Sequence, residues 1–236
     1  MDAALFRADL EQVPARLRAL ADLLDDGTAL APVEHLLAVR PRRVLLLGMG
    51  SSRFAAGPAA RLLRAAAIDA VSESAAAEES YAPSEDLLVV AVSATGASAE
   101  TLAAAQRYAG RSPLLAVVNQ PGSPLADLVG STLEMAAGEE RGGVACRTYR
   151  HTLALLLALA ERLAGRVPAV SRAVRRAAAA SEELLAGAER WLPQVADRLG
   201  GGGVWCAAPV ERLDPFAAAV LETAGERADD AETSGR

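Results

Sequence analysis

The sequence contains no lysine, because all 24 of its basic residues are arginine. A mechanism that needs a lysine Schiff base or a lysine general acid is therefore excluded for this chain. Aromatic residues are scarce too, at 3%, although 52% of the chain is apolar. The core must be built mostly from Ala, Leu and Val. This composition favours helices packed on a parallel sheet over an aromatic-rich β-sandwich.

Cysteine is nearly absent as well. Cys146 and Cys206 are the only two, so the chain has no disulfide framework and no metal-ligand spacing. We therefore expect no metal and no cofactor, and a reducing compartment such as the cytoplasm. The charged, amphipathic N-terminus does not resemble a signal sequence. The most apolar stretch, HTLALLLALAERL, has about half the apolar length that a membrane span needs, so we expect no membrane partner.

A surplus of positive charge is also missing. The net charge is −6, with acidic and basic residues interleaved along the chain. Nucleic-acid grooves usually show a basic surplus, so this balance argues against direct binding of nucleic acid.

Five apolar stretches alternate with helical patterns. The alternation predicts an α/β fold: a doubly wound, parallel, five-stranded sheet flanked by helices. Residues 1–40 are predicted to form a helical N-terminal segment and residues 41–165 the α/β domain. Residues 166–236 are predicted to be a helical connection followed by the truncated start of a second α/β unit. The five predicted strands lie in RRVLLLG, IDAVSE, EDLLVVAV, SPLLAVVN and STLEMA.

The first predicted strand runs into a glycine-serine loop, LLLGMGSS. Gly48 and Gly50 suit a dinucleotide-binding turn, in which glycine lets the backbone approach a pyrophosphate. The third glycine of that pattern is replaced by Arg53, although Glu73 follows at a suitable distance. Two other interpretations remain open: a tight turn that simply needs glycine, and a sugar-contacting loop in which serines supply hydroxyls.

The stretch SATGASAET follows the most apolar predicted strand. It holds four hydroxyl side chains beside Gly96, and a predicted helix begins within it. The free N–H groups and the positive dipole end of that helix favour an anion, and a phosphate accepts hydrogen bonds from hydroxyls and N–H groups alike. Alternatively, Ser98 only caps the helix. From these residues alone both interpretations stand.

Four motifs in order resemble the sugar isomerase (SIS) domain family: GMGSS, SATGASAET, VVNQPGSPLAD and RGGVACRTYRHTL. The resemblance covers about residues 41 to 165. It is greatest to the isomerase half of glucosamine-6-phosphate synthase and to related phosphosugar isomerases. It implies a cradle for the sugar phosphate and a second set of residues that contact the sugar. The implied cradle is Ser93, Thr95, Gly96, Ser98 and Thr101, and the implied sugar contacts are Gly50, Ser51, Ser52 and Val144.

The chain departs from the family pattern at two places. Ala97 replaces an acidic residue in the cradle motif, and the family's ASTK element reads ACRT here. Cys146 stands in that element in place of serine. We expect Cys146 to be a small, partly buried residue and not a nucleophile, because no base is evident near it.

A catalyst for aldose–ketose isomerisation needs a base that moves a proton and a group that opens the sugar ring. The resemblance implies a glutamate base from a second unit, for which Glu222 is the best counterpart and Glu226 the next. A solvated helix residue is the alternative for Glu222. No counterpart of the family's ring-opening histidine is present. His151 is expected to be packed and hydrogen-bonded, and nothing places His35 near the cradle.

The sequence therefore predicts a phosphosugar-binding protein whose partner is a small sugar phosphate. If it is an enzyme, we expect a phosphosugar isomerase or an amino-sugar-phosphate deaminase. A non-catalytic sugar-phosphate sensor is the alternative, and a nucleotide-binding α/β domain is a weaker one. We also expect a homodimer, because SIS domains commonly pair and the stretch VWCAAPV would otherwise leave apolar surface uncovered.

Overall fold

The computed structural model describes residues 2–38 and 41–199 of the chain and divides it into two units, residues 1–183 and 184–236. The first unit begins with four short helical elements. Its elements are α1 (Ala3–Glu11), α2 (Val13–Asp25), the 3-10 turn η1 (Ala31–Val33) and α3 (Glu34–Ala38). In the second unit the described part holds α9 (Ala188–Leu199). No helix in the described residues is long and apolar enough to cross a membrane.

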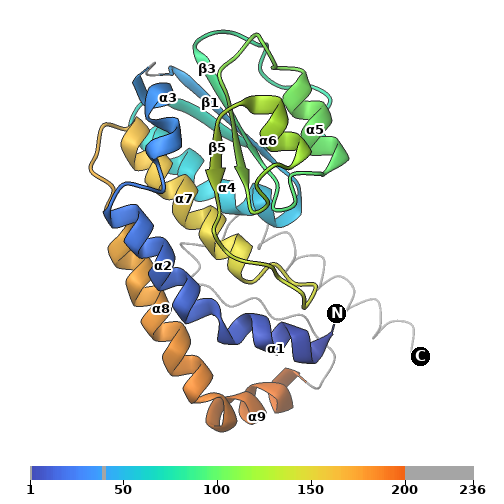
Figure 1. Cartoon of the computed structure of the whole chain (residues 1–236), viewed down its shortest axis with the longest axis vertical. Coiled ribbons are helices and arrows are strands. Elements are labelled where there is room, and N and C mark those ends of the chain that lie inside the picture. The colour runs from blue at the N-terminus through green and yellow to red at the C-terminus, as the bar shows by residue number, and fades with distance from the viewer. Residues whose placement is uncertain (1, 39–40, 200–236) are drawn as a thin grey trace, which may run out of the picture. The chain divides into compact units, whose positions relative to one another are not determined.

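A five-stranded sheet forms the centre of the first unit (Figure 1). Its strand order is β2-β1-β3-β4-β5, and every neighbouring pair is parallel. The order reverses beside β1, as in a doubly wound sheet. The predicted fold class is therefore confirmed. The strands are β1 (Arg43–Gly48), β2 (Asp69–Ser74), β3 (Leu87–Val92), β4 (Leu114–Val118) and β5 (Thr132–Glu134).

Helices cover both faces of this sheet (Figure 1). The two helices α4 (Gly50–Ala65) and α7 (Arg147–Leu163) pack together on one face. On the other face lie α5 (Ala99–Gln106) and α6 (Pro124–Val129). The long helix α8 (Val170–Ala186) runs beside α2 and is tied to it by an ion pair between Arg175 and Asp22.

Alternate side chains of each strand enter opposite halves of the core. Leu46 and Val90 pack on the α4 and α7 side, whereas Leu45 and Val89 pack on the α5 side against Tyr108. Because both faces are covered, β1, β3 and β4 read as continuous apolar runs and not as an apolar–polar alternation. This burial makes these three strands recognisable in the sequence, whereas the edge strands β2 and β5 are less buried.

One predicted boundary is wrong. The glycine-serine stretch after β1 is not a separate loop, because α4 begins at Gly50 and includes Ser51 and Ser52 in its first turn. Gly50 adopts a φ of +47°, a backbone conformation that glycine tolerates far better than other residues. The preceding Met49 is extended, so the turn from strand to helix is made within one residue.

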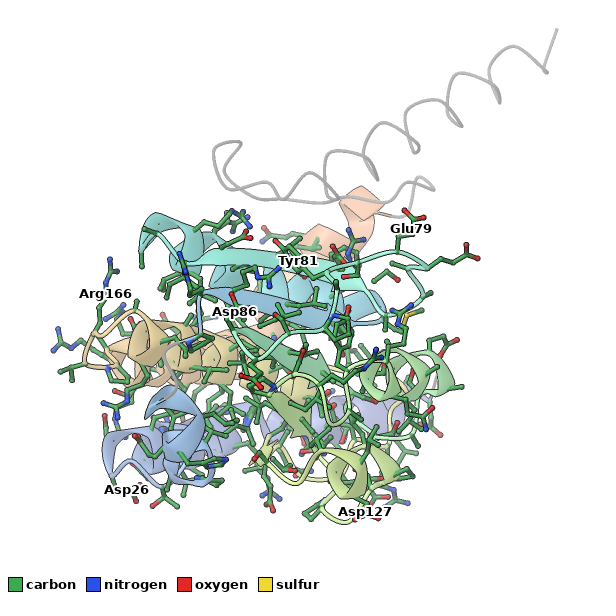
Figure 2. All side chains as sticks on the ribbon, turned by 90° about the horizontal axis from the view of Figure 1, so that it is seen from above. Asp26, Glu79, Tyr81, Asp86, Asp127 and Arg166 are labelled. Carbon is green, nitrogen blue, oxygen red and sulfur yellow. The ribbon has the colours of Figure 1, made fainter. Side chains whose placement is uncertain are left out.

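The amino ends of the strands carry an ion-paired cluster. The Arg43 guanidinium donates to the Asp86 carboxylate at 2.9 Å and lies over the Tyr81 ring, 5.6 Å from its centroid. Tyr81 and Asp86 are both labelled in Figure 2. A cavity of about 590 Å³ opens beside this cluster, lined by Pro41, Arg42, Arg43, Ala67, Ile68, Asp69 and Asp86. In open parallel sheets ligands bind at the carboxyl ends of the strands. This cavity therefore lies at the edge of the sheet where ligands are less often bound.

Candidate functional site

A pocket of about 440 Å³ lies at the carboxyl ends of β3, β4 and β5. The loop after each of these three strands contributes a wall, and the first turns of α7 close the pocket. No cationic side chain is among the residues described as lining it. These residues are Ala94, Thr95, Asn119, Gln120, Gly138, Glu139, Glu140, Gly143, Val144, Ala145 and Thr148.

The wall that follows β3 is a tight turn rich in hydroxyls. Ser93 is buried, and its Oγ accepts a hydrogen bond from the Gly96 N–H at 3.1 Å. Thr95 Oγ1 accepts from the Ala97 N–H at 3.2 Å. In both cases the hydroxyl acts as acceptor and keeps its own proton. Of the two residues only Thr95 lines the pocket, where its hydroxyl can donate to a ligand. Gly96 has a φ of +63°, which the turn requires.

Ser98 is the N-cap of α5. Its Oγ accepts from the Thr101 N–H at 3.3 Å and donates to the Glu100 carboxylate at 2.9 Å. Hydrogen bonds from its own backbone N–H and from Ser98 lower the pKa of Glu100. The capping role suggested by the sequence is therefore present. It does not exclude a phosphate, because the remaining N–H groups of the first turn are still directed out of the helix.

The turn NQPGSP braces this wall from the β4 side. Asn119 Oδ1 accepts from the Ala137 N–H at 3.0 Å, and its Nδ2 donates to the Gly138 carbonyl at 2.8 Å. The Leu125 N–H donates to the Gly96 carbonyl at 2.9 Å. One amide side chain thus joins the loops after β4 and β5, and the turn holds the loop after β3.

Glu140 caps the first turn of α7 at the pocket. Its carboxylate accepts from the Arg147 N–H at 2.5 Å and from Thr148 Oγ1 at 2.5 Å. Burial raises the pKa of Glu140, but hydrogen bonds from Thr148, Arg147 and Cys146 outweigh it, so the pKa is lowered. Glu140 is therefore a carboxylate at neutral pH, and its oxygens are occupied by the helix. The adjacent Glu139 also lines the pocket.

Cys146 precedes α7 and is only 7% exposed. Burial, followed by a hydrogen bond to Glu140 and the negative charge of Glu140, raises the pKa of the Cys146 thiol to about 11. The thiolate is the reactive form, so this environment disfavours nucleophilic chemistry. The thiol is small and buried, as the sequence indicates.

Neither histidine is among the residues described as lining the pocket. His151 is fully buried on α7, with Nδ1 2.6 Å from the Met135 carbonyl. Burial lowers the pKa of His151. His35 Nε2 lies 3.1 Å from Ser131 Oγ, and Ser131 directly precedes β5. His35 therefore lies at the amino edge of the sheet, opposite the pocket. The packed, hydrogen-bonded state expected for His151 is present.

The structure brings the predicted binding residues to one edge of the sheet, though not all to one surface. Thr95 and Val144 line the pocket. Ser93 and Gly96 are buried within the turn that carries Thr95, Thr101 is buried in the first turn of α5, and Ser98 caps that helix. Gly50, Ser51 and Ser52 lie at the end of β1 in the first turn of α4. Glu222 and Glu226, the predicted base and its alternative, lie outside the described residues.

Five polar residues of the pocket were not proposed as site residues from the sequence: Asn119, Gln120, Glu139, Glu140 and Thr148. Asn119 and Gln120 belong to a turn motif that was recognised, so their place at the end of a predicted strand was a usable signal. The two glutamates follow the last, shortest strand. Their position depends on how the loop after β5 folds back towards α7, and no local pattern specifies that.

The SIS domain family matches residues 37–162 of the chain. Among solved structures, the C-terminal domain of glucosamine-fructose-6-phosphate aminotransferase from Francisella tularensis has a TM-score of 0.64 at 15% identity, covering 84% of this chain and 59% of that one. Glucosamine-6-phosphate deaminase from Thermotoga maritima has a TM-score of 0.56 at 19% identity, covering 70% and 52%. The Vibrio vulnificus NanR protein complexed with ManNAc-6P has a TM-score of 0.50 at 21% identity, covering 73% and 69%.

These structural similarities establish the fold. At 15–21% identity they do not carry an activity from those proteins to this one. The chain spans less than two thirds of the length of the aminotransferase domain and of the deaminase. No relative was found among curated protein sequences.

Proposed function

Because this chain belongs to the SIS domain family, we propose that it binds a phosphorylated sugar in the pocket at the carboxyl ends of β3, β4 and β5. The observation that carries the proposal is the turn from Ser93 to Ser98. It places Thr95 in the pocket wall and leads directly into the N-terminus of α5. Hydroxyls, backbone N–H groups and a helix N-terminus together suit a phosphate without a cationic side chain.

The sugar would lie towards the loop after β5. That side of the pocket offers the Asn119 amide, the Thr148 hydroxyl and the carboxylate of Glu139. Such groups hydrogen-bond the hydroxyls or an amino group of a sugar. Val144, exposed at 37%, offers an apolar surface at the same place. Three of the similar structures bear names that include phosphorylated sugars or amino sugars, in agreement with this ligand class.

We leave catalysis as a second step of the proposal. An isomerase or amino-sugar-phosphate deaminase would use Glu222 as its base, in keeping with the family resemblance. The alternative is a non-catalytic sensor, favoured by the placement of both histidines away from the pocket wall and by similarity to the NanR protein, which was solved with a sugar phosphate. Turnover of a bound phosphosugar separates the two.

Calorimetric titration tests the binding proposal. We expect fructose 6-phosphate or glucosamine 6-phosphate to bind, and the matching free sugars to bind at least about a hundredfold more weakly, since charged hydrogen bonds are lost. Thr95→Val and Ser98→Ala should each weaken phosphosugar binding by about tenfold or more, because each removes one hydroxyl from the cradle.

The matched control is Asp26→Ala. Asp26 Oδ1 accepts from the Thr28 N–H at 2.8 Å in the turn after α2, so this change also removes a bond from a side chain to a backbone amide, but not one at the pocket. Equal loss of affinity in Asp26→Ala and Ser98→Ala would mean that the Ser98 hydroxyl has no specific role in the cradle. If a folded wild-type protein bound no phosphosugar, the proposal would be rejected. Binding of a nucleotide that Ser98→Ala leaves unchanged would instead support the weaker alternative, a nucleotide-binding domain that uses the glycine turn at Gly48 and Gly50.

A homodimer remains part of the proposal, on the strength of the family resemblance. Light scattering at micromolar concentration measures it directly. A mass of one chain would contradict it.

A further inference from the structure

A buried ion pair connects the first helix of the chain to the start of α7. The Arg147 Nη2 atom lies 2.9 Å from Asp9 Oδ1, and the two side chains are 0% and 4% exposed. Asp9 is on α1, and Arg147 is the first residue of α7. The pair joins positions 138 residues apart in the sequence.

Both partners also hold the loop that follows β5. Asp9 Oδ2 accepts from the Arg141 N–H at 2.8 Å and from the Gly142 N–H at 2.7 Å. The Arg147 guanidinium donates to the Glu139 carbonyl and to Gln12 Oε1. One carboxylate thus binds a guanidinium with one oxygen and two successive backbone amides with the other. A neutral or apolar side chain could not accept all three.

Gly142 brings the loop backbone against α1. A Cβ built on Gly142 would lie 2.3 Å from Phe6 Cα and 2.5 Å from the Phe6 nitrogen, which real Cβ atoms do not approach. The contact is backbone against backbone, so no side-chain rotation can relieve it. The residues on both sides of Gly142 are those that line the pocket, Glu139, Glu140, Gly143 and Val144 among them.

A buried ion pair of this kind is weak evidence of a stabilising role. Desolvation of two charges offsets much of their attraction, and well-packed apolar residues often stabilise a core equally well. What the pair adds is a fixed geometry for the backbone it holds. Here that backbone is one wall of the pocket.

We propose that Asp9 and Arg147 are positioning residues for the ligand pocket: α1 holds the loop of residues 139–145 in the shape that binds. The inference rests on the proposed binding of a phosphosugar. It assigns the N-terminal helix a role in ligand affinity, although neither Asp9 nor Arg147 lines the pocket.

The test compares Asp9→Asn with Leu63→Ala. Asn at position 9 cannot accept from the guanidinium and from both amides at once. Leu63 is a buried residue of α4 in the core that α4 and α7 share, so Leu63→Ala lowers stability without contacting the loop. Two quantities are measured under conditions in which circular dichroism shows every protein folded. They are the affinity for the best phosphosugar and the hydrogen-exchange rate of the amides in residues 139–145.

In Asp9→Asn we expect the affinity to fall by about tenfold or more and exchange in the loop to accelerate by a similar factor. Neither change is expected in Leu63→Ala. Gly142→Ala provides a second route, because it displaces the loop from α1 while leaving the ion pair chemically intact. It replaces Asp9→Asn if that variant does not fold.

Equal effects in Leu63→Ala would overturn the inference, since overall stability would then explain them. Faster exchange with unchanged affinity would also overturn it. If the wild-type protein bound no phosphosugar, the proposed function would fail separately. Loop exchange would then still decide whether α1 holds the loop, with acceleration in Asp9→Asn supporting the inference and its absence overturning it.

Discussion

Gly96 and Ser123 lie so close together that a Cβ built on Gly96 would stand 2.0 Å from Ser123 Oγ. Ser123 Oγ is buried and has no hydrogen-bond partner among the described residues. The two residues belong to different motifs, SATGASAET and NQPGSP. The loops after β3 and β4 therefore meet at a point where only a hydrogen atom fits, and the pocket wall depends on that contact.

Replacing Gly96 with alanine should be costly for two reasons. The φ of +63° strains any residue with a Cβ, and the new methyl group collides with Ser123. We expect the free energy of unfolding in urea to fall by about 2–4 kcal/mol.

Gly110→Ala is the matched control, since Gly110 has a φ of +71° with nothing within 4 Å of the added Cβ. It should lose only about 1 kcal/mol, from backbone strain alone. In Gly96→Ala, a second change of Ser123→Gly should recover part of the loss. Equal losses in the two alanine variants would mean that the contact with Ser123 contributes nothing.

The strands were predictable because their signal is local. Each of β1, β3 and β4 is a short apolar run between polar turns, and a sheet covered on both faces requires such runs. The turn at Gly96 and the cap at Ser98 were predictable for the same reason. A glycine and hydroxyl side chains between a predicted strand and a predicted helix are typical of a tight turn followed by a helix cap.

Contacts between distant segments were not predictable. Nothing near Asp9 in the sequence indicates that it binds Arg147, because the pairing depends on how α1 packs against the loop after β5. The start of α4 at Gly50 was missed because glycine is a poor helix former, and its role here is to make the turn that precedes the helix. The placement of Glu140 in the pocket required the folded loop in the same way.

Glu140 should contribute stability that depends on pH. Its pKa in the folded protein is lowered from 4.5, so its contribution is complete above that value and is lost as the pH falls below it. Glu140→Gln removes charge-assisted bonds to the N-terminus of α7. We expect unfolding in urea near neutral pH to show a loss of about 1–2 kcal/mol.

The control for Glu140 is the exposed Glu85, for which Glu85→Gln removes the same charge from a loop. Glu85→Gln should leave stability near the wild-type value. A loss in Glu85→Gln as large as in Glu140→Gln would indicate a general charge effect instead of a specific cap.

His151 should make the free energy of unfolding depend on pH in a less acidic range than Glu140 does. Burial lowers the pKa of the folded imidazole below 6.5, so the unfolded state takes up a proton that the folded state does not. The free energy of unfolding therefore decreases as the pH falls below 6.5, and it recovers as the pH rises again. His151→Gln should abolish this decrease, as measured by urea unfolding at about pH 7.5 and about pH 5.5.

The second histidine supplies the comparison for His151. His35→Gln removes an imidazole that contacts Ser131 at the opposite edge of the sheet. The decrease between the two pH values should persist in that variant. If the decrease disappeared in His35→Gln and persisted in His151→Gln, the pH dependence would belong to His35 and the prediction would be contradicted.

Cys146 should resist alkylation in the folded protein. A pKa of about 11 in place of 9.0 leaves about a hundredfold less thiolate near pH 8, and burial at 7% exposure hinders the reagent further. The measurement is the rate of reaction with iodoacetamide in a Cys206→Ser background, which leaves Cys146 as the only thiol. The same protein unfolded in urea is the control and should react at the rate of an ordinary thiol. Rapid alkylation of the folded protein, lost on addition of a phosphosugar, would instead make Cys146 an accessible group at the ligand pocket.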